Sequence, residues 1–512
     1  MTATGESITV TQPRSISWSS REPAVAAFLV AAFVILRSAG MGTPVPEVWA
    51  ALASLVALVS PLAGFLAAVA LGPFDDWPVL GTEAGGRAVL VAALALSVAV
   101  RLSRGMRAPT RSGLTALRPR TRSPLQTPAG MALGSAAVVL LGTGLGVMHT
   151  TLRFGTDLGY QAAQLWATGV GMALVVLFIG AWFGARNELR PVLVAAGAAV
   201  VGVGFSLVYQ VMPAFLATSP LEWLIVVERG ARRLDGILAA PNAMAMLALL
   251  PACLLVARLI HVRSALALVV GAVVMSVLAV GALATSSRSA VLAVAAVAVA
   301  YAWHIRRSAA IVMLVVAGVG AAVLVPLYVE QRAGTPLPGA GDILQDFFTA
   351  GDRIRSAGWA AAIRMALDSP LIGQGFRSYL VLHEQFGDAV QTAPHNEWLR
   401  LYAEQGIVVG TAGLIFLGAA LTAFWRMRGS LALGAFGTLL AYAIMAGFNN
   451  PLNYAQLNIP TFAVLGVVLG MAVRQGAARA PLRIATGPPE AASEGLSGPA
   501  AGASKGSSAA GS

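Results

Sequence analysis

The chain is dominated by repeated apolar runs, most of them about 18–25 residues long. A helix of this length crosses the roughly 30 Å hydrocarbon core of a bilayer. In lipid, only helices and closed barrels satisfy every backbone polar group. The sequence therefore predicts an all-α polytopic membrane protein with about 12–14 transmembrane helices. The runs lie at 23–40, 46–72, 85–102, 129–149, 162–185, 190–211, 241–260, 265–285, 288–305, 308–328, 405–424, 431–448 and 459–474.

The composition supports one membrane domain rather than several soluble ones. Only 11% of the 512 residues are charged, whereas soluble domains carry about a quarter. We expect a polar N-terminal tail over 1–22, a multi-span domain over 23–475, and a disordered cytoplasmic tail over 476–512, which is rich in Gly, Ala, Ser and Pro. The one cysteine, Cys253, lies in an apolar run, so neither an intrachain disulfide nor a cysteine metal cluster is expected.

The net charge of +12 arises from arginines gathered between the apolar runs. Seven of them fall between residues 101 and 125, a pattern typical of cytoplasmic loops. Such clusters can contact anionic lipid headgroups, so we expect membrane lipids, and no nucleic acid, as partners. Other basic positions that assign connections to the inside are Arg186, Arg190, His261, Arg263, Arg306, Arg307, Arg426, Arg428, Arg474 and Arg479.

The remaining connections then face outside: 73–84, 149–161, 212–240, 285–288, 329–404 and 449–458. This gives thirteen spans and an outside N-terminus, unless the run 46–72, interrupted by Pro61, forms a hairpin of two short helices. The long segment 329–404 has the length of a functional loop. Within it, Ile343–Leu367 combines apolar residues at helical spacing with arginines, which predicts a helix at the membrane surface.

Arg233 belongs to the first outside-facing polar motif, Arg233-Leu-Asp-Gly236, which is followed by Pro241-Asn242. An arginine at the outer end of a helix opposes the usual charge bias, and an anionic partner would explain it. A snorkelling interfacial side chain is the alternative. Arg229 and Arg232 nearby leave the individual assignment open.

Arg288 ends a second motif, Thr285-Ser-Ser-Arg288, in a very short turn between two apolar runs. This position lies at the outer membrane interface, where a lipid-linked phosphate would sit. The structural alternative is that Arg288 caps carbonyls of the preceding helix.

His395 and Asn396 form the third motif, which continues with Gly406 and Gly410. Histidine is the side chain whose usual pKa suits proton transfer near neutral pH. A lone histidine is more often structural, so the surrounding motifs decide its interpretation.

Several other chemistries lack their sequence signals. There is no phosphate-binding GxxxxGK[ST] motif and no dinucleotide fingerprint in a strand-to-helix context, and Asp75-Asp76 alone is weak evidence for a metal. Gly142-Thr-Gly144 lies in an apolar run and is better explained by helix packing. We therefore expect no metal and no cofactor.

Taken in order, these motifs resemble those of the O-antigen ligase and O-antigen polymerase superfamily of bacterial membrane glycosyltransferases. The resemblance covers roughly residues 190–475 and includes a further motif, Arg355-Ser-Ala-Gly-Trp359 with Pro370-Leu-Ile-Gly373-Gln-Gly375. It implies transfer of a glycan from undecaprenyl diphosphate to a lipid, protein or glycan-chain acceptor at the outer face of the inner membrane, with inversion and without metal.

The same resemblance assigns roles to individual residues. Arg233 and Arg288 match arginines that hold the diphosphate, Arg355 matches the arginine of the loop helix, and His395 matches the histidine that activates the acceptor. Asn242, Trp359 and Asn396 belong to the same motifs and would support the site. The additional arginines Arg232, Arg353, Arg364 and Arg377 leave the individual roles open.

Two other functions fit a polytopic protein. A transporter or flippase for a lipid-linked polysaccharide would place charged residues or broken helices near the bilayer midplane, whereas these apolar runs are nearly free of charge. A non-catalytic membrane scaffold is the third possibility. The polar motifs at one face favour an enzyme, although ligase and polymerase are not separated.

Overall fold

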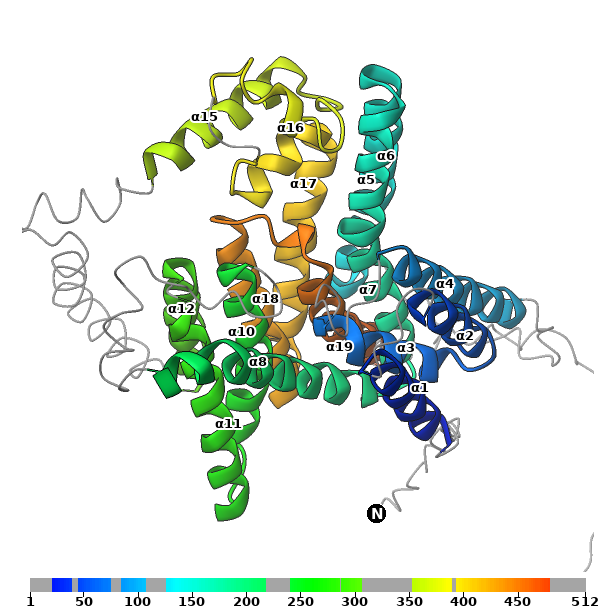
Figure 1. Cartoon of the computed structure of the whole chain (residues 1–512), viewed down its shortest axis with the longest axis vertical. Coiled ribbons are helices and arrows are strands. Elements are labelled where there is room, and N and C mark those ends of the chain that lie inside the picture. Colours follow the sequence, from blue (N-terminus) through cyan, green and yellow to red (C-terminus); the bar gives the residue numbers. More distant parts are fainter. Residues whose placement is uncertain are drawn as a thin grey trace, which may run out of the picture.

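The computed structural model describes residues 21–38, 45–74, 84–106, 126–217, 240–285, 287–305, 352–388 and 393–478 (Figure 1). All regular structure in these ranges is helical. Eight candidate spans among them are long and apolar enough to cross a membrane. The chain is therefore an all-α polytopic membrane protein, as the apolar runs predicted.

The helices follow the predicted runs closely. The N-terminal part contains α1 Arg21–Ser38, α2 Val45–Val59, α3 Pro61–Leu71, α4 Ala84–Met106, α5 Pro128–Phe154, α6 Thr156–Thr168, α7 Val170–Gly184 and α8 Arg190–Ala217. The rest contains α10 Pro241–Leu259, α11 Ala265–Ala284, α12 Arg288–Ile305, α15 Asp352–Asp368, α16 Tyr379–Leu382, α17 Glu397–Arg426, α18 Ser430–Ala446 and α19 Ala455–Ala478, with short 3-10 turns at Gly72–Phe74 and Pro451–Asn453. The run 308–328 and the tails 1–20 and 479–512 lie outside the described residues.

Two predicted runs are divided. The run 46–72 becomes α2 and α3, because Ser60 caps the second helix by accepting from the backbone N–H of Ala63 and Pro61 occupies its first position. The run 162–185 lies in α6 and α7, which meet at Gly169 with non-helical backbone angles. The two helices together still form one candidate span, Thr156–Gly184. Apolar character alone does not report the change of backbone angles at Gly169.

Small residues hold the central helices α7 and α19 together. A Cβ added at Gly180 would lie 2.9 Å from the carbonyl oxygen of Ala463. Added methyl groups at Gly184, Gly466 and Gly470 would collide with the facing backbone. This close approach is how helices associate in lipid, where burial of apolar surface supplies little driving force.

α5 packs against α17 at Gly142, whose packing role the sequence predicted, and at Gly146. A side chain at Gly142 would collide with Val409, and one at Gly146 would collide with Gln405. Gly144 instead faces Trp166. The opposite face of α5 is apolar and exposed at helical spacing, which suits contact with lipid: Leu141, Leu145, Met148 and Leu152.

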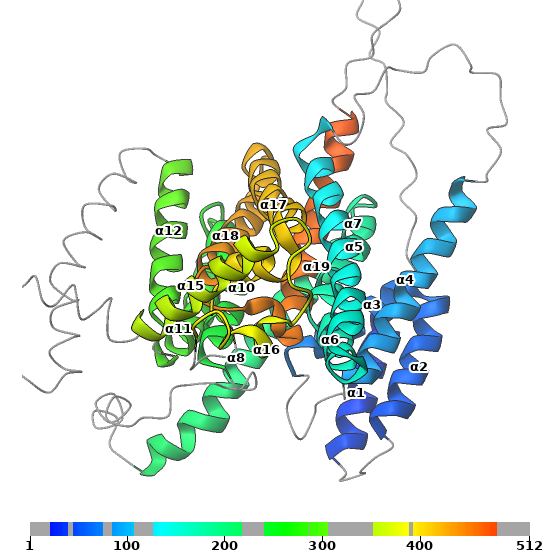
Figure 2. The same ribbon diagram turned by 90° about the horizontal axis from the view of Figure 1, so that it is seen from above.

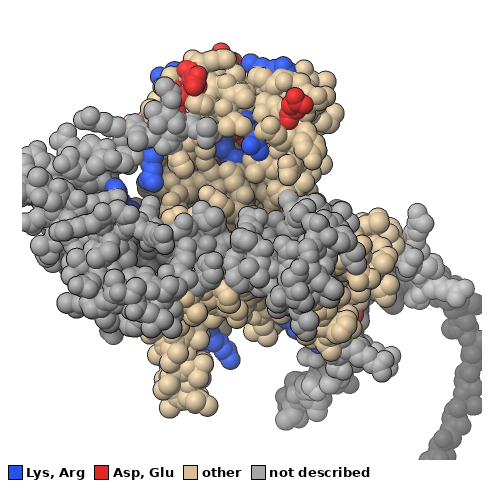
Figure 3. Space-filling model, in the orientation of Figure 1, with Lys and Arg blue, Asp and Glu red and all other residues tan. Residues whose placement is uncertain are grey.

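A cap made of α15, α16 and their connections lies over the N-terminal end of α17 (Figures 1 and 2). Its small core contains Met365, Tyr379 and Leu382. On the described surface in Figure 3, charged atoms gather mainly over this cap, and most of the surface below it is uncharged. The predicted surface helix 343–367 is described from Asp352 and ends at Asp368, while 343–351 lies outside the described residues.

The cap is docked at a kink in α17. Gly406 has φ +73 inside that helix, which L side chains rarely adopt. The kink lets the backbone N–H of Ile407 donate to the Pro370 carbonyl at 2.8 Å, while Gln374 and Gly375 donate to the carbonyls of Ala403 and Glu404. The two glycine motifs, around 373–375 and at 406, are therefore parts of one joint.

Candidate active site

Asn449 joins the beginnings of three helices. Its side-chain oxygen accepts from the Asn242 amide of α10 at 2.6 Å, and its amide donates to the Ser289 hydroxyl of α12 at 3.2 Å. Its carbonyl accepts from the backbone N–H of Glu397, the first residue of α17, at 3.1 Å. Three motifs far apart in the sequence thus meet at one end of the bundle.

This convergence has an electrostatic consequence. A helix carries partial positive charge at its N-terminus, which favours anions. α10, α12 and α17 all present N-terminal ends here. A group bearing two phosphates would be stabilised by these ends together with any nearby guanidinium group.

Arg288 is the first residue of α12 and is partly buried. The Ser287 hydroxyl contacts the backbone N–H of Ala290 at 3.4 Å and lies 3.1 Å from the Ser289 hydroxyl. A positive side chain at a helix N-terminus opposes the helix dipole, and an anion beside it would remove that cost. Arg288 thus lies at a helix start, next to the serine that contacts Asn449.

His395 lies directly before α17 with φ +48, a backbone conformation uncommon for a side-chain-bearing residue. The next residue, Asn396, caps α17 by accepting from the backbone N–H of Leu399 at 3.1 Å. Burial lowers the pKa of the His395 imidazole, Arg355 lowers that pKa further, and Asp388 partly opposes both. A neutral imidazole able to accept a proton therefore predominates at neutral pH.

α15 brings Arg355 and Trp359 to the same region. The Trp359 ring lies 6.3 Å from the ring of Phe448, measured between centroids, and Phe448 precedes Asn449. Between them, Gly358 has no side chain, and a Cβ there would lie 3.4 Å from the Cα of Pro394. The cap helix consequently packs directly on the segment that carries His395.

A buried charged group lies just inside the site and was missed by the sequence analysis. Arg400 forms an ion pair with Glu397 and donates to the Asn453 side chain at 2.8 Å. Glu404 accepts from the backbone N–H of Tyr379 at 3.3 Å. All three charged residues are at most 4% exposed. The sequence signal for this buried group was the set of polar residues between 397 and 405, at the start of the apolar run 405–424.

Two of the additional arginines have structural partners. Arg364 donates to the Phe386 carbonyl at 2.8 Å and lies under Gly387. Arg377 is directed to the Gln161 carbonyl at 3.4 Å on an exposed part of α6. These contacts join parts of the cap and α6.

Six of the seven predicted site residues lie in described parts of the chain: Asn242, Arg288, Arg355, Trp359, His395 and Asn396. The structure gathers them at the N-terminal ends of α10, α12 and α17 and under the cap. Arg233 lies outside the described residues. Asn449 was missed, although two asparagines at the end of an apolar run were a usable signal.

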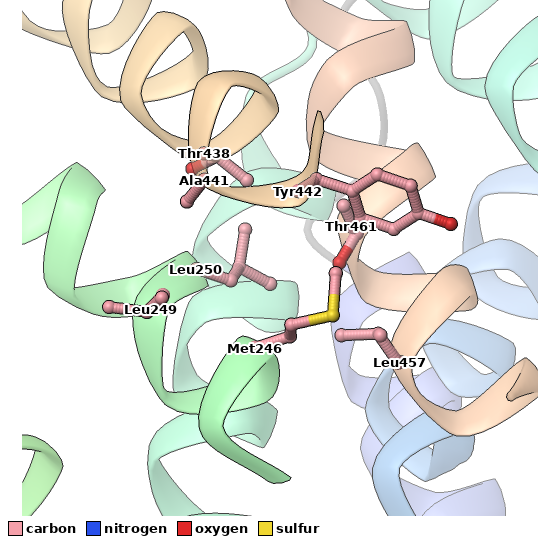
Figure 4. Close-up of a pocket in the computed structure, with 8 residues that line it drawn as sticks. All are labelled: Met246, Leu249, Leu250, Thr438, Ala441, Tyr442, Leu457 and Thr461. Atoms are coloured by element: carbon pink, nitrogen blue, oxygen red, sulfur yellow. The ribbon is translucent and has the colours of Figure 1, made fainter. Parts of the chain in front are cut away.

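A cavity elsewhere in the bundle does not belong to this site. It lies among α10, α18 and α19 and is lined by Met246, Tyr442 and Thr461 with five neighbours (Figure 4). Its volume of about 10 Å³ is room for roughly one water molecule. A lipid-linked sugar cannot occupy it.

Comparison with known protein families matches residues 273–415 to the O-antigen ligase family. The matched segment begins within α11 and ends within α17, so it contains Arg288, the cap and His395. A comparison with curated proteins found no match. The match over residues 273–415 supports the O-antigen ligase superfamily that the motifs indicated.

Proposed function

We propose that the protein transfers a glycan from undecaprenyl diphosphate to an acceptor at the outer face of the inner membrane. The family match supports lipid-linked glycan transfer in general. The observation that carries the specific proposal is the convergence of three helix N-termini on Asn449, beside Arg288 and His395. This arrangement combines an anion-binding end of the bundle with a nearby base.

Arg288, Arg355 and Arg233 hold the diphosphate in this proposal. As the bond between the anomeric carbon and the phosphate oxygen breaks, its electron pair passes to the diphosphate, whose negative charge grows. Fixed guanidinium groups and helix N-termini stabilise that charge as it develops. These residues take the place of a metal ion, so we expect transfer without metal or nucleotide.

His395 acts as the general base. The acceptor hydroxyl forms a bond to the anomeric carbon while its proton passes to the imidazole. The products are the glycosylated acceptor, undecaprenyl diphosphate and a proton that His395 returns to solvent. Attack from the face opposite the diphosphate inverts the anomeric configuration. Asn396 and Trp359 support this geometry through the α17 cap and the packing of α15.

The acceptor determines whether the enzyme is a ligase or a polymerase. A lipid or protein acceptor gives a ligase, and the end of another glycan chain gives a polymerase. Both reactions use the same donor and the same base, so both are compatible with the proposal.

The proposal is tested by complementing a strain that lacks the gene with Arg288→Ala or His395→Ala. We expect each variant to reach the membrane at the wild-type level and to lose surface-polysaccharide length or attachment, measured by gel electrophoresis of envelope glycans. The matched control is Arg426→Ala, because Arg426 is an exposed arginine at the other end of α17. It should complement fully.

Full complementation by either site variant would contradict the proposed mechanism. A deletion strain that retains single repeat units on the carrier inside the cell would instead indicate transport. Compartment-specific extraction of the lipid-linked glycan distinguishes these outcomes.

A further inference from the structure

Asp388 is a fully buried carboxylate between the cap helices and the segment that carries His395. Its side chain accepts from the Tyr379 hydroxyl at 2.7 Å, and its backbone carbonyl lies 2.5 Å from Nδ1 of His383. A buried carboxylate is costly unless hydrogen bonds or an opposite charge compensate it. No part of the proposed transfer reaction yet uses it.

Gly358 shows how close this carboxylate comes to the His395 segment. A Cβ added there would lie 3.3 Å from Oδ2 of Asp388, 3.3 Å from the Tyr379 hydroxyl oxygen and 3.4 Å from the Cα of Pro394. The three groups therefore surround one point on α15. Pro394 immediately precedes His395, so the Asp388 carboxylate is fixed beside the segment that carries His395.

The charges around His395 are opposed. Asp388 favours the protonated imidazole, whereas Arg355 on α15 disfavours it. Other titratable or charged groups on the packed elements are Tyr379 and His383 around α16, Arg364 on α15, and Glu397 and Arg400 on α17. Tyr379 remains a hydrogen-bond donor, because burial and the neighbouring Asp388 raise the pKa of its phenol.

We propose that Asp388 is the positioning carboxylate of His395, fixed by the Tyr379 hydroxyl and acting against the positive charge of Arg355. A carboxylate beside a histidine base stabilises the imidazolium that forms when the base takes its proton. Asp388 would thereby keep His395 basic enough to act in a partly buried, arginine-rich site. The catalytic consequence rests on the proposed function, whereas the coupling between the two residues does not.

The coupling is measured without substrate by the reaction of His395 with diethyl pyrocarbonate, which modifies the neutral imidazole. The full-length protein in detergent is treated at pH 5.5 and at pH 8, and modification of His395 is followed by mass spectrometry. Asp388→Asn removes a negative charge and lowers the pKa of His395, so the rate at pH 5.5 relative to pH 8 should rise about threefold. Arg355→Gln should lower this ratio by about the same factor.

Glu384→Gln is the matched control, because it removes an exposed carboxylate four residues from Asp388. It should leave the ratio unchanged, and Asp388→Glu, which keeps the charge, should restore it. An unchanged or lower ratio in Asp388→Asn would overturn the proposal. If Asp388→Asn does not fold, Arg355→Gln carries the test. A modification ratio that does not fall in this variant would contradict the proposed opposition of Arg355 and Asp388 at His395.

A second measurement separates this inference from the proposed function. Transfer is followed across pH with glycan carrier extracted from the deletion strain and with its envelope fraction as acceptor. In Asp388→Asn, the acid limb of the pH profile should move to lower pH, in parallel with the modification ratio. If the ratio changes while the limb does not move, Asp388 still tunes His395, but His395 is not the base of the reaction.

Discussion

At the scale of single residues, the site is organised by side-chain amides that connect helix ends. The Asn449 side chain hydrogen-bonds to Asn242 and Ser289, and its backbone carbonyl accepts from the first residue of α17. An amide is suited to this role because it both donates and accepts without carrying a charge into the apolar bundle. The helix ends are thus connected without using the arginines that are proposed to bind the substrate.

Asn449→Ala should therefore reduce transfer more than it reduces stability. It leaves the Asn242 amide and the Ser289 hydroxyl without this partner, which costs about 1–3 kcal/mol. It thereby frees the beginnings of α10 and α12 to move away from α17, whose backbone contact with residue 449 remains. The measurement is the transfer rate of purified protein beside its thermal midpoint in detergent.

Asn458→Ala is the matched control for this substitution. Asn458 is also a buried amide, bonded to the Tyr442 hydroxyl and the Pro451 carbonyl, but it does not connect the three helix ends. We expect a similar loss of stability with transfer largely retained. Equal loss of transfer in both variants would show that Asn449 has no special role.

At the scale of elements, the decisive feature is the joint between α17 and the cap. Gly373, Gly375 and Gly406 all have positive φ, and side chains at Gly373 or Gly406 would collide with the backbone of the opposing segment. At the kink, backbone groups of α17 that would otherwise bond within the helix bond instead to the loop around Gly373 and Gly375. The loop position then fixes α15 and the approach of Arg355 to His395.

Gly406→Ala should loosen the cap. It combines backbone strain of about 1–3 kcal/mol with a collision against the Leu371 carbonyl. Gly429→Ala is the matched control, because Gly429 has φ +114 with no atom within 4 Å of an added Cβ. The thermal midpoint should fall further for Gly406→Ala, and protease cleavage within the cap should increase only there. Equal effects would mean that backbone strain alone matters and that the joint does not hold the cap.

At the scale of the whole molecule, the site and the basic connections lie at opposite ends. α17 starts beside the site and ends at Arg426 after 30 residues, a length of roughly 45 Å. The arginine-rich connection at Arg426 and Arg428 is expected inside by the charge rule. The cap and His395 would then face outside.

This orientation is tested with single cysteines in a Cys253→Ala background, since Cys253 is the one cysteine of the chain. Both Glu384 and Arg428 are exposed. A membrane-impermeant maleimide should label Glu384→Cys in intact spheroplasts and Arg428→Cys only after permeabilisation. The reverse pattern would place the site inside the cell and exclude a periplasmic reaction.

The sequence by itself determined the elements and the superfamily. Long apolar runs must become helices in lipid because no other open structure satisfies the backbone there. Polar residues such as Arg288 and His395 stood out because apolar runs bound the segments that carry them. The break at Ser60 was foreseen as an alternative because Pro61 follows it, whereas the break at Gly169 was not, because a run keeps its apolar character across a change of backbone direction.

Only the tertiary structure decided which polar residues meet. Asn242, Ser289, Glu397 and Asn449 are separated by up to 207 positions, and local pattern carries no information about such partners. The same holds for Asp388 beside the His395 segment, and for the carbonyl partners of Arg364 and Arg377. Helix packing set these contacts, because glycines allowed backbones to approach and amides then bonded wherever the helix ends came together.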